Sequence, residues 1–483
     1  MFRIILTLFL SCICTLPVHA KSRVNLLSDF AKSEALKNST YSIYAKYVGG
    51  KDIIKKDKNL LMPPASVLKL FTTSAVLDII GKDKTFETKV YLKGNILKGR
   101  IFGDIYIVGG GDPSFGSKDF DGNNFYTEVF SSWAQELKNK GITQINGNIY
   151  ADNSLFSGML LPWYTSFKNV GNYFAPKADA LSIANNTYKI VFPPTKKEQK
   201  NIKPLRIEPQ IKDVNFKSSV YTTEDAENEN VYVTFEPAQN IINLNGVLPI
   251  TDKETAVYGS LPNPAKFAAE SMLNIFNKSG IKVLGLADVK KGENYEDAKL
   301  LFTHISPTVA ELVKHTNKRS DNLYAGVLLR DLSAYKDGEG SAKEGLERLN
   351  EYLENIGLDK ESFDIYDASG LSYQNNVSCQ AAVTLLEKIL DKPYAQTFKD
   401  SLVIAGNIGE KNIFGMRVKD KNFAFKTLLK TGALDKARTI AGYAKNKKGK
   451  DIVFCFFINN FKAKSKDITA LQESFLEYLA NLN

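Results

Sequence analysis

Ser66 and Lys69, in the stretch MPPASVLKLF at residues 62–71, have the types and spacing of a nucleophile and its base. Residues three apart lie on one face of a helix, so the lysine amine can take the proton of the serine hydroxyl. A lysine is a base only when it is neutral, and burial and a nearby cation, for which Lys430 is the candidate, both lower its pKa. Taken alone, the pair fits a helix cap followed by an ordinary lysine better, so its assignment depends on the rest of the chain.

The same Ser-x-x-Lys spacing recurs at residues 279–282 and 333–336, but neither copy begins a buried helix. The first contains Gly280, which is typical of a helix end, and the second runs into the loop-like sequence DGEG. Residues 66–81, in contrast, are apolar nearly all round and end at a glycine, which predicts a central buried helix. The free N–H groups and the dipole at the start of such a helix favour a developing anion at Ser66.

The motif Ser320-Asp321-Asn322 opens a second helical pattern, SDNLYAGVLLRDL. Its position predicts that the Ser320 hydroxyl lies in a loop or a first helical turn, where it can relay a proton. The amide of Asn322 can bond a carbonyl of the substrate or the amine of Lys69.

The motif Lys430-Thr431-Gly432 ends an alternating segment that predicts a strand. At a sheet edge its backbone can pair with an extended peptide. Lys430 and Thr431 suit a terminal carboxylate, and Gly432 permits close approach. We expect the backbone N–H groups of Ser66 and Ala433 to form the oxyanion hole.

Histidine is scarce, and this limits the chemistry of the site. Only His304 and His315 follow residue 20. A Ser-His-Asp triad would need one of them, and a histidine-based metal site would need more, and neither lies in a metal-ligand spacing. We therefore expect a lysine base, no metal and no organic cofactor, with His315 as a structural residue.

The elements that must position these motifs predict a mixed helix–sheet (α/β or α+β) fold. A strand pattern at 41–50 precedes the buried helix, strand-rich sequence runs from 84 to 261, helical patterns return from 264, and strands reappear before a closing helix at 467–481. We expect the N-terminal and C-terminal strands to share one sheet. The predicted domains are a helix–sheet core at 21–83 and 262–483, and a β-rich insertion at 84–261, in one or two parts.

The first twenty residues predict export. A short positive start, an apolar run and the sequence Val18-His19-Ala20 indicate a secretory signal peptide cleaved after Ala20. Lipidation at Cys12 is the less favoured alternative. No later apolar run is long enough to span a bilayer, so we expect a periplasmic protein with at most peripheral membrane association.

The charge and cysteine content exclude some classes of protein. The net charge of +10 is spread along the chain without a basic block, which disfavours a nucleic-acid partner. Export would leave Cys379 and Cys455, too few for a disulfide framework, with their pairing open.

In their order and context, the three motifs resemble the signature of penicillin-binding proteins and serine β-lactamases. The segments VGGGDPSF (108–115), YADNSLFSG (150–158) and YDASGLSYQNNVS (366–378) resemble peptidase family S13, the D-alanyl-D-alanine carboxypeptidase/endopeptidases of the penicillin-binding protein 4 type. The resemblance covers essentially the whole mature chain. It implies a transpeptidase-like domain interrupted by two nested β-rich domains. The implied activity is cleavage of the terminal D-Ala-D-Ala bond, and of D-Ala–diaminopimelate cross-links, in peptidoglycan through an acyl-enzyme that β-lactams also form.

The resemblance also implies a pocket for the side chain of the stem peptide, with Asp152, Phe156 and Tyr373 as candidates. The chain departs from the family pattern at Tyr373, where arginine is frequent, at Ala433, where serine or threonine is frequent, and in GNIGEKNIF at 406–414. These departures concern recognition of the substrate rather than the catalytic groups. They leave open the third residue of the stem peptide and the balance of the two activities.

Two alternatives remain. A class A β-lactamase would carry Glu-x-x-Leu-Asn after the Ser-Asp-Asn motif, whereas here Glu270-Ser-Met-Leu-Asn274 precedes Ser320 in a much longer chain. A non-catalytic protein that binds the cell wall is disfavoured because all three motifs are intact. The oligomeric state is not predicted.

Overall fold

A computed structural model describes residues 23–120, 125–161, 164–225, 229–405 and 426–483 of the 483-residue chain. The predicted signal peptide, with Cys12 and Ala20, and the segment 406–414 lie outside the described residues. Within the described ranges, no helix is both long enough and apolar enough to cross a membrane.

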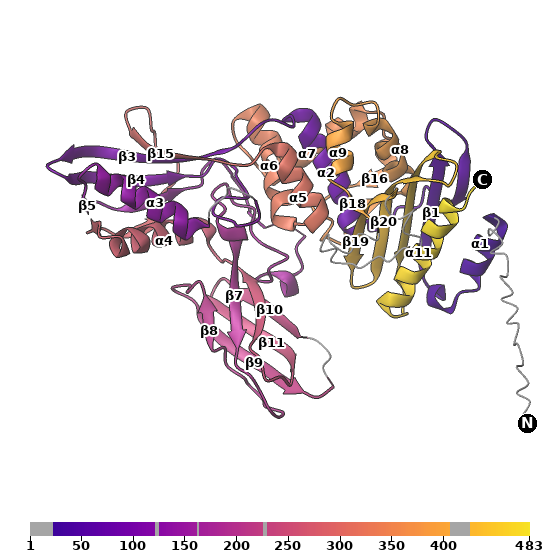
Figure 1. The fold of residues 1–483 in the computed structure, drawn as a ribbon, viewed down its shortest axis with the longest axis horizontal. Coiled ribbons are helices and arrows are strands. Elements are labelled where there is room, and N and C mark those ends of the chain that lie inside the picture. The colour runs from indigo at the N-terminus through magenta and orange to yellow at the C-terminus, as the bar shows by residue number, and fades with distance from the viewer. Residues whose placement is uncertain (1–22, 121–124, 162–163, 226–228, 406–425) are drawn as a thin grey trace, which may run out of the picture.

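A six-stranded sheet forms one end of the elongated molecule (Figure 1). The first strand, β1, pairs antiparallel with the last strand, β21, from Thr40↔Asn459 to Tyr47↔Ile452. The prediction that N-terminal and C-terminal strands share one sheet is therefore confirmed. In the order in which they lie side by side, the strands are β18 (Val403–Ile404), β19 (Leu428–Leu434), β20 (Ala437–Lys445), β21 (Asp451–Asn459), β1 (Thr40–Tyr47) and β2 (Asp52–Lys56).

Both faces of this sheet are covered, which explains why β21 is apolar throughout. On one face, Phe454 and Phe456 contact Phe475 of helix α11 (Ser465–Ala480). The ring centroid of Phe475 is 5.9 Å from that of Phe454 and 5.3 Å from that of Phe456. Cys455 faces the other layer, where it lies beside Cys379 of α8 (Cys379–Ile389), and both thiols are free and buried. Helix α1 (Arg23–Ala31) packs with α11.

Helix α2 (Lys69–Ile79) is the centre of the helical layer on the other face, and Lys69 to Leu77 are all buried. The predicted buried helix is confirmed, but its first turn differs from the prediction. Ser66 lies in a 3-10 turn, η2 (Ala65–Leu68), and the α-helix begins at Lys69. Around α2 pack α5 (Val309–Arg319), α6 (Asn322–Asp337), α7 (Ala342–Asn355) and α9 (Ala395–Asp400), and a short hairpin of β16 (Phe363–Asp364) and β17 (Asn376–Val377) lies nearby.

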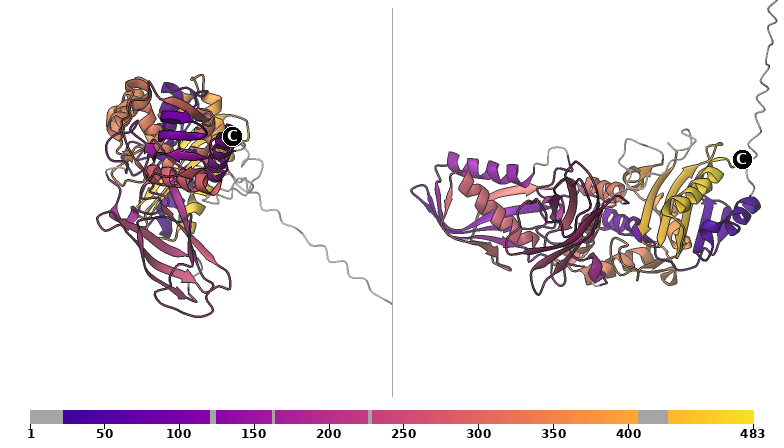
Figure 2. Two further views of the ribbon diagram at one scale, coloured as in Figure 1. Left: turned by 90° about the vertical axis from the view of Figure 1, so that its left-hand side faces the viewer. Right: turned by 90° about the horizontal axis from the view of Figure 1, so that it is seen from below.

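A seven-stranded sheet lies at the opposite end of the long axis (Figures 1 and 2). Helices α3 (Tyr126–Asn139) and α4 (Pro264–Lys278) pack against its apolar face. The strands are β3 (Glu87–Leu97), β4 (Arg100–Val108), β5 (Gln144–Asn146), β6 (Ile149–Asp152), β13 (Lys282–Val283), β14 (Ala287–Val289) and β15 (Lys299–Ile305).

Two three-stranded sheets occupy the chain between β6 and α4 and project from the long axis in Figure 1. One contains β9 (Asn215–Thr223), β10 (Asn230–Glu236) and β11 (Ile241–Pro249), and the other β7 (Thr187–Phe192), β8 (Arg206–Glu208) and β12 (Thr255–Ser260). The domain limits predicted from the sequence stay a prediction. Because β15 pairs with β3, we propose that the inserted region extends to Ile305 rather than to residue 261.

Candidate active site

Ser66 and Lys69 lie in direct contact at the start of α2. The amine Nζ of Lys69 is 3.0 Å from Ser66 Oγ, 2.6 Å from Asn322 Oδ1 and 2.8 Å from the carbonyl oxygen of Ser369. These acceptors come from three separate parts of the chain. They hold the buried amine against the hydroxyl of Ser66, which is itself only partly buried.

Burial lowers the pKa of Lys69 to about 7, while the negative charges of Asp367 and Asp321 act in the opposite direction. Lys430 is also completely buried, and burial followed by the charge of Lys69 lowers its pKa well below the usual value. The sequence predicted that Lys430 would act on Lys69. In the structure, burial is the main cause of the lowered pKa of both amines, and the charge of Lys69 adds to it at Lys430.

Lys430 connects the other two motifs. Its Nζ donates to Ser320 Oγ at 2.9 Å and to the carbonyl oxygen of Thr431 at 2.7 Å. A Ser–Lys contact therefore lies on each side of the site, one between Ser66 and Lys69 and one between Ser320 and Lys430.

The turn between α5 and α6 presents the second motif. Ser320 ends α5 with a φ of 58°, in the left-handed region. Asp321 then caps α6, because its Oδ1 accepts the N–H groups of Leu323 at 2.9 Å and Tyr324 at 3.3 Å. Asn322 is the first residue of α6, and its Nδ2 donates to the carbonyl oxygen of Phe174 at 2.6 Å.

Two glycines, Gly432 on β19 and Gly370 in the loop before β17, let their segments approach the Ser66 turn closely. A Cβ atom on Gly432 would lie 2.8 Å from the backbone nitrogen of Ser66. A Cβ on Gly370, where φ is 82°, would lie 1.8 Å from the carbonyl oxygen of Ala65. A side chain at either position would displace the nucleophile.

A cavity of about 520 Å³ opens beside Ser66. Ser320, Asn322, Tyr373 and Ala433 line it, whereas Thr431 and Gly432 lie buried behind it on β19. β18 pairs with β19 only at Leu428 and Leu429, and in the described part of the chain no strand pairs with residues 430–434 on that side. Basic and acidic side chains also face the cavity, from Lys168, Arg319, Asp435 and Arg438.

The structure does not bring Asp152 and Phe156 to this cavity. Asp152 is buried and accepts a hydrogen bond from the hydroxyl of Tyr295 at 2.7 Å. Phe156 is buried against Arg330. Glu270 lies on α4, which packs against the seven-stranded sheet, and it does not line the cavity either.

Asp367 is a residue that sequence reasoning missed. Its carboxylate is buried and accepts the backbone N–H groups of Ser369, Gly370 and Ser372 at 2.6 to 2.7 Å. It thus fixes the loop whose Ser369 carbonyl accepts from Lys69. The signal was present in the quoted segment YDASGLSYQNNVS, because an aspartate before Ser and Gly is typical of such a turn.

Substituting Asp367→Asn is expected to move the acidic limb of the pH–rate profile to lower pH. The Asp367 charge raises the pKa of Lys69 against the effect of burial, so its loss leaves more neutral Lys69 at a given acidic pH. Lost charge-assisted hydrogen bonds should also lower the free energy of unfolding by about 2–3 kcal/mol. Acylation rates measured between about pH 5 and about pH 9, on either side of the Lys69 pKa of about 7, check this prediction. An acidic limb that stays at the same pH in Asp367→Asn would contradict it.

Comparisons with known proteins match this chain to D-alanyl-D-alanine carboxypeptidases over most of its length. The model of the D-Ala-D-Ala carboxypeptidase 3 (S13) family matches residues 23–481. A D-alanyl-D-alanine carboxypeptidase of Actinomadura sp. (strain R39) is 26% identical over 417 residues, which cover 83% of this chain and 74% of that protein. The D-alanyl-D-alanine carboxypeptidase DacB of Haemophilus influenzae is 25% identical over 480 residues, covering 98% of this chain and 95% of that protein.

Solved structures show a similar fold. The crystal structure of penicillin-binding protein 4 (dacB) from Haemophilus influenzae has a TM-score of 0.81 at 23% identity, covering 95% of this chain and 100% of the other. Its complex with a β-lactam has a TM-score of 0.75 at 23% identity, covering 94% and 99%. The mixed helix–sheet fold predicted from the sequence is confirmed.

Proposed function

This chain belongs to the D-Ala-D-Ala carboxypeptidase 3 (S13) family and is a serine-type carboxypeptidase, and we propose that it hydrolyses the terminal D-Ala-D-Ala bond of peptidoglycan stem peptides through an acyl-enzyme on Ser66. The resemblance drawn from the motifs is thereby confirmed at the level of the family. Cleavage of D-Ala–diaminopimelate cross-links is part of the same proposal, because it breaks the same kind of bond on the carboxyl side of a D-Ala residue.

The observation that carries the proposal is the position of Lys69. Its amine contacts the Ser66 hydroxyl at 3.0 Å, and burial lowers its pKa to about 7. A large share of Lys69 is then neutral near pH 7, so that it can accept the Ser66 proton. A scaffold protein would have no need of a buried lysine held in this state.

The reaction proceeds in two steps. Neutral Lys69 takes the proton of Ser66, and Ser66 Oγ attacks the carbonyl carbon of the penultimate D-Ala. The backbone N–H groups of Ser66 and Ala433 stabilise the oxyanion. Ser320, in contact with Lys430, relays the proton taken by Lys69 to the departing amine, so that D-Ala leaves and Lys69 is neutral again. Neutral Lys69 then takes a proton from the water that attacks the ester, and it returns this proton to Ser66 as the acyl group leaves.

The substrate binds along β19. An extended stem peptide adds to the unpaired edge at residues 430–434, which brings its scissile carbonyl to Ser66. Arg319 and Arg438 at the cavity suit a ligand with a free carboxylate. Tyr373 is about half exposed at the same cavity and forms part of the side-chain pocket.

The proposal includes β-lactams as covalent inhibitors and export to the periplasm by the segment 1–20. A β-lactam presents a strained amide to the same nucleophile, remains on Ser66 as an ester, and is released slowly as the acid when water hydrolyses that ester. The presence of a β-lactam in the complex of the similar Haemophilus protein supports this part.

The purified enzyme, incubated with a disaccharide-pentapeptide and with a cross-linked dimer, tests the proposal. We expect free D-Ala and a disaccharide-tetrapeptide from the first, and monomers from the second, identified by mass. Binding of the pentapeptide without release of D-Ala would instead indicate a non-catalytic protein.

A further inference from the structure

The β-rich insertion contacts the turn that carries Ser320 and Asn322. One contact is direct, because Asn322 Nδ2 donates to the carbonyl oxygen of Phe174 at 2.6 Å. Asn322 Oδ1 accepts from Lys69 Nζ at the same time. Since only the NH₂ group of an amide donates, the Phe174 carbonyl fixes which end of the Asn322 amide faces the lysine.

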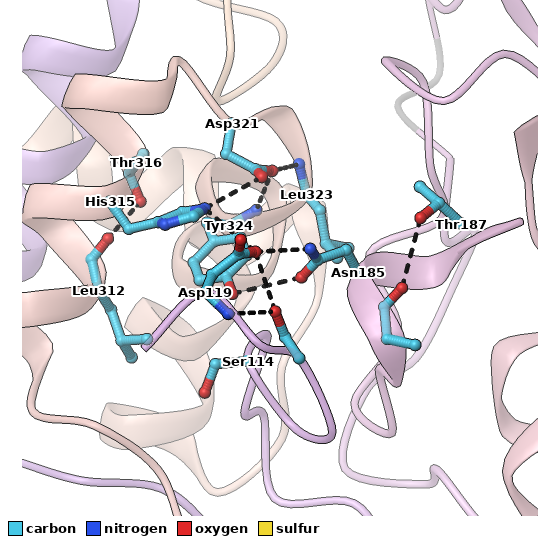
Figure 3. A network of polar contacts seen from close by, with 12 residues as sticks. Ser114, Asp119, Asn185, Thr187, Leu312, His315, Thr316, Asp321, Leu323 and Tyr324 are labelled. Carbon is cyan, nitrogen blue, oxygen red and sulfur yellow. Dashed lines mark hydrogen bonds and ion pairs between the residues drawn. The ribbon is translucent and has the colours of Figure 1, made fainter. Parts of the chain in front are cut away.

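A second contact runs through His315, one of the two histidines that follow residue 20, neither of which the catalytic proposal uses. His315 lies on α5 with only 8% of its side chain exposed. Its Nε2 is 3.4 Å from Asp321 Oδ2 and 3.9 Å from Asp119 Oδ2 (Figure 3). Its ring lies against that of Tyr324, with centroids 4.3 Å apart. Because carboxylates only accept hydrogen bonds, the 3.4 Å contact with Asp321 is a hydrogen bond when Nε2 carries the hydrogen. Asp119, at 3.9 Å, lies within ion-pair distance of Nε2 but beyond hydrogen-bond distance.

Asp119 belongs to the insertion and is itself held in place. Its Oδ2 accepts from Asn185 Nδ2 at 2.6 Å and from Ser117 Oγ at 2.9 Å (Figure 3). Asn185 Oδ1 in turn accepts from the hydroxyl of Tyr324 at 3.5 Å. The network therefore begins on two loops of the insertion and ends on the first turn of α6.

This network acts on a turn that needs support. Ser320 has a φ of 58°, a left-handed conformation that is strained for a non-glycine residue and persists where its surroundings hold it. Asp321 Oδ1 caps the backbone of α6, which leaves Oδ2 for His315. Asp321 follows Ser320 directly in this turn, and the Ser320 hydroxyl accepts a hydrogen bond from Lys430 Nζ at 2.9 Å.

We propose that the insertion holds the Ser320–Asn322 turn in its working geometry through the juxtaposition of Asp119, His315 and Asp321, with His315 as the positioning residue. This inference rests on the function proposed above. It gives the insertion a part in catalysis in addition to any part in binding the cell wall. The sequence predicted a structural role for His315, and under this proposal that role is to support the turn that carries Ser320.

Two substitutions at His315 separate positioning from packing. His315→Phe keeps a ring against Tyr324 and removes the N–H, whereas His315→Gln places an amide N–H near the position of Nε2. We expect kcat for D-Ala release to fall about 10- to 100-fold in His315→Phe, as for a small misplacement of a catalytic group. KM should change little, because His315 does not line the cavity. His315→Gln should regain most of the lost kcat.

His304→Phe is the matched control. His304 lies on β15 beside a carboxylate, with Nε2 3.7 Å from Asp112 Oδ2, and its ring is 5.0 Å from that of Phe115. Within the described chain, neither of these contacts involves the α5–α6 turn. The kcat of the His304→Phe enzyme should therefore equal that of the wild type. An equal loss of kcat in this control would overturn the inference.

Asp119→Asn provides an independent variant should His315→Phe not fold. We expect a loss of kcat similar to that of His315→Phe, and no further loss in the double variant, because the two residues act as one unit. Wild-type kcat in Asp119→Asn, or a His315→Gln enzyme as slow as His315→Phe, would contradict the inference. Failure of the proposed function looks different, because the wild-type enzyme itself would then release no D-Ala.

Discussion

Ser66→Ala is expected to abolish D-Ala release, with kcat falling by about 10⁶-fold or to the detection limit. The variant removes the oxygen that forms the ester, and among the described residues that line the cavity no other hydroxyl contacts Lys69. Ser320, the other serine there, has its hydroxyl directed at Lys430 rather than at Lys69. The fold should be kept, because Ser66 is only partly buried and alanine suits a helical turn.

Ser279→Ala is the matched control, since Ser279 begins another Ser-x-x-Lys copy but ends α4 on the seven-stranded sheet. The Ser279→Ala enzyme should retain wild-type activity.

Stem peptide should still bind to Ser66→Ala, and calorimetry can measure this binding. Activity in Ser66→Ala above about 1% of wild type, a loss of less than about 2.7 kcal/mol in transition-state stabilisation, would contradict the assignment of the nucleophile.

Lys69→Met is expected to lower the rate of acylation by about 10²- to 10⁴-fold, the usual contribution of a general base. Methionine is similar in length and apolar, so the cavity around it stays filled. The loss of the amine leaves Asn322 Oδ1 and the Ser369 carbonyl without this donor, which should cost about 1–3 kcal/mol each in stability, offset by removal of a buried amine. Stopped-flow measurement with a chromogenic β-lactam gives the rate.

The pH dependence of the wild-type acylation rate tests the same role of Lys69. Lys69 acts when neutral, and its pKa is about 7, so the acylation rate should rise as the pH increases through 7. This limb should vanish in Lys69→Met and persist in Lys282→Met, which alters the exposed lysine of another Ser-x-x-Lys copy. An acylation rate that falls between about pH 6 and about pH 8, on either side of the Lys69 pKa of about 7, would contradict neutral Lys69 as the base.

The contact between Ser66 and Lys69 followed from local spacing, which is why sequence could predict it. A 3-10 turn, like an α-helix, puts residues three apart on one face, so the prediction did not depend on where the helix begins. The order of the three motifs indicated that they meet, and the structure brings them together around Lys69 and Lys430.

What the sequence could not provide are contacts between distant segments. The Ser369 carbonyl reaches Lys69 from a loop 300 residues further along the chain, and no periodicity encodes that approach. The link from Asp119 to Asp321 joins the insertion to the core and is equally invisible in local patterns. Asp152 and Phe156 were assigned by resemblance of a segment, and their burial away from the cavity reflects packing that a short motif does not describe.

Locating the covalent adduct of a β-lactam tests the central claim most directly. The enzyme is incubated with benzylpenicillin, digested, and the modified peptide is sequenced by mass spectrometry. We predict a penicilloyl ester on Ser66 and on no other residue. An adduct on a different residue, or an enzyme that is unmodified while it still releases D-Ala from the stem peptide, would contradict the account.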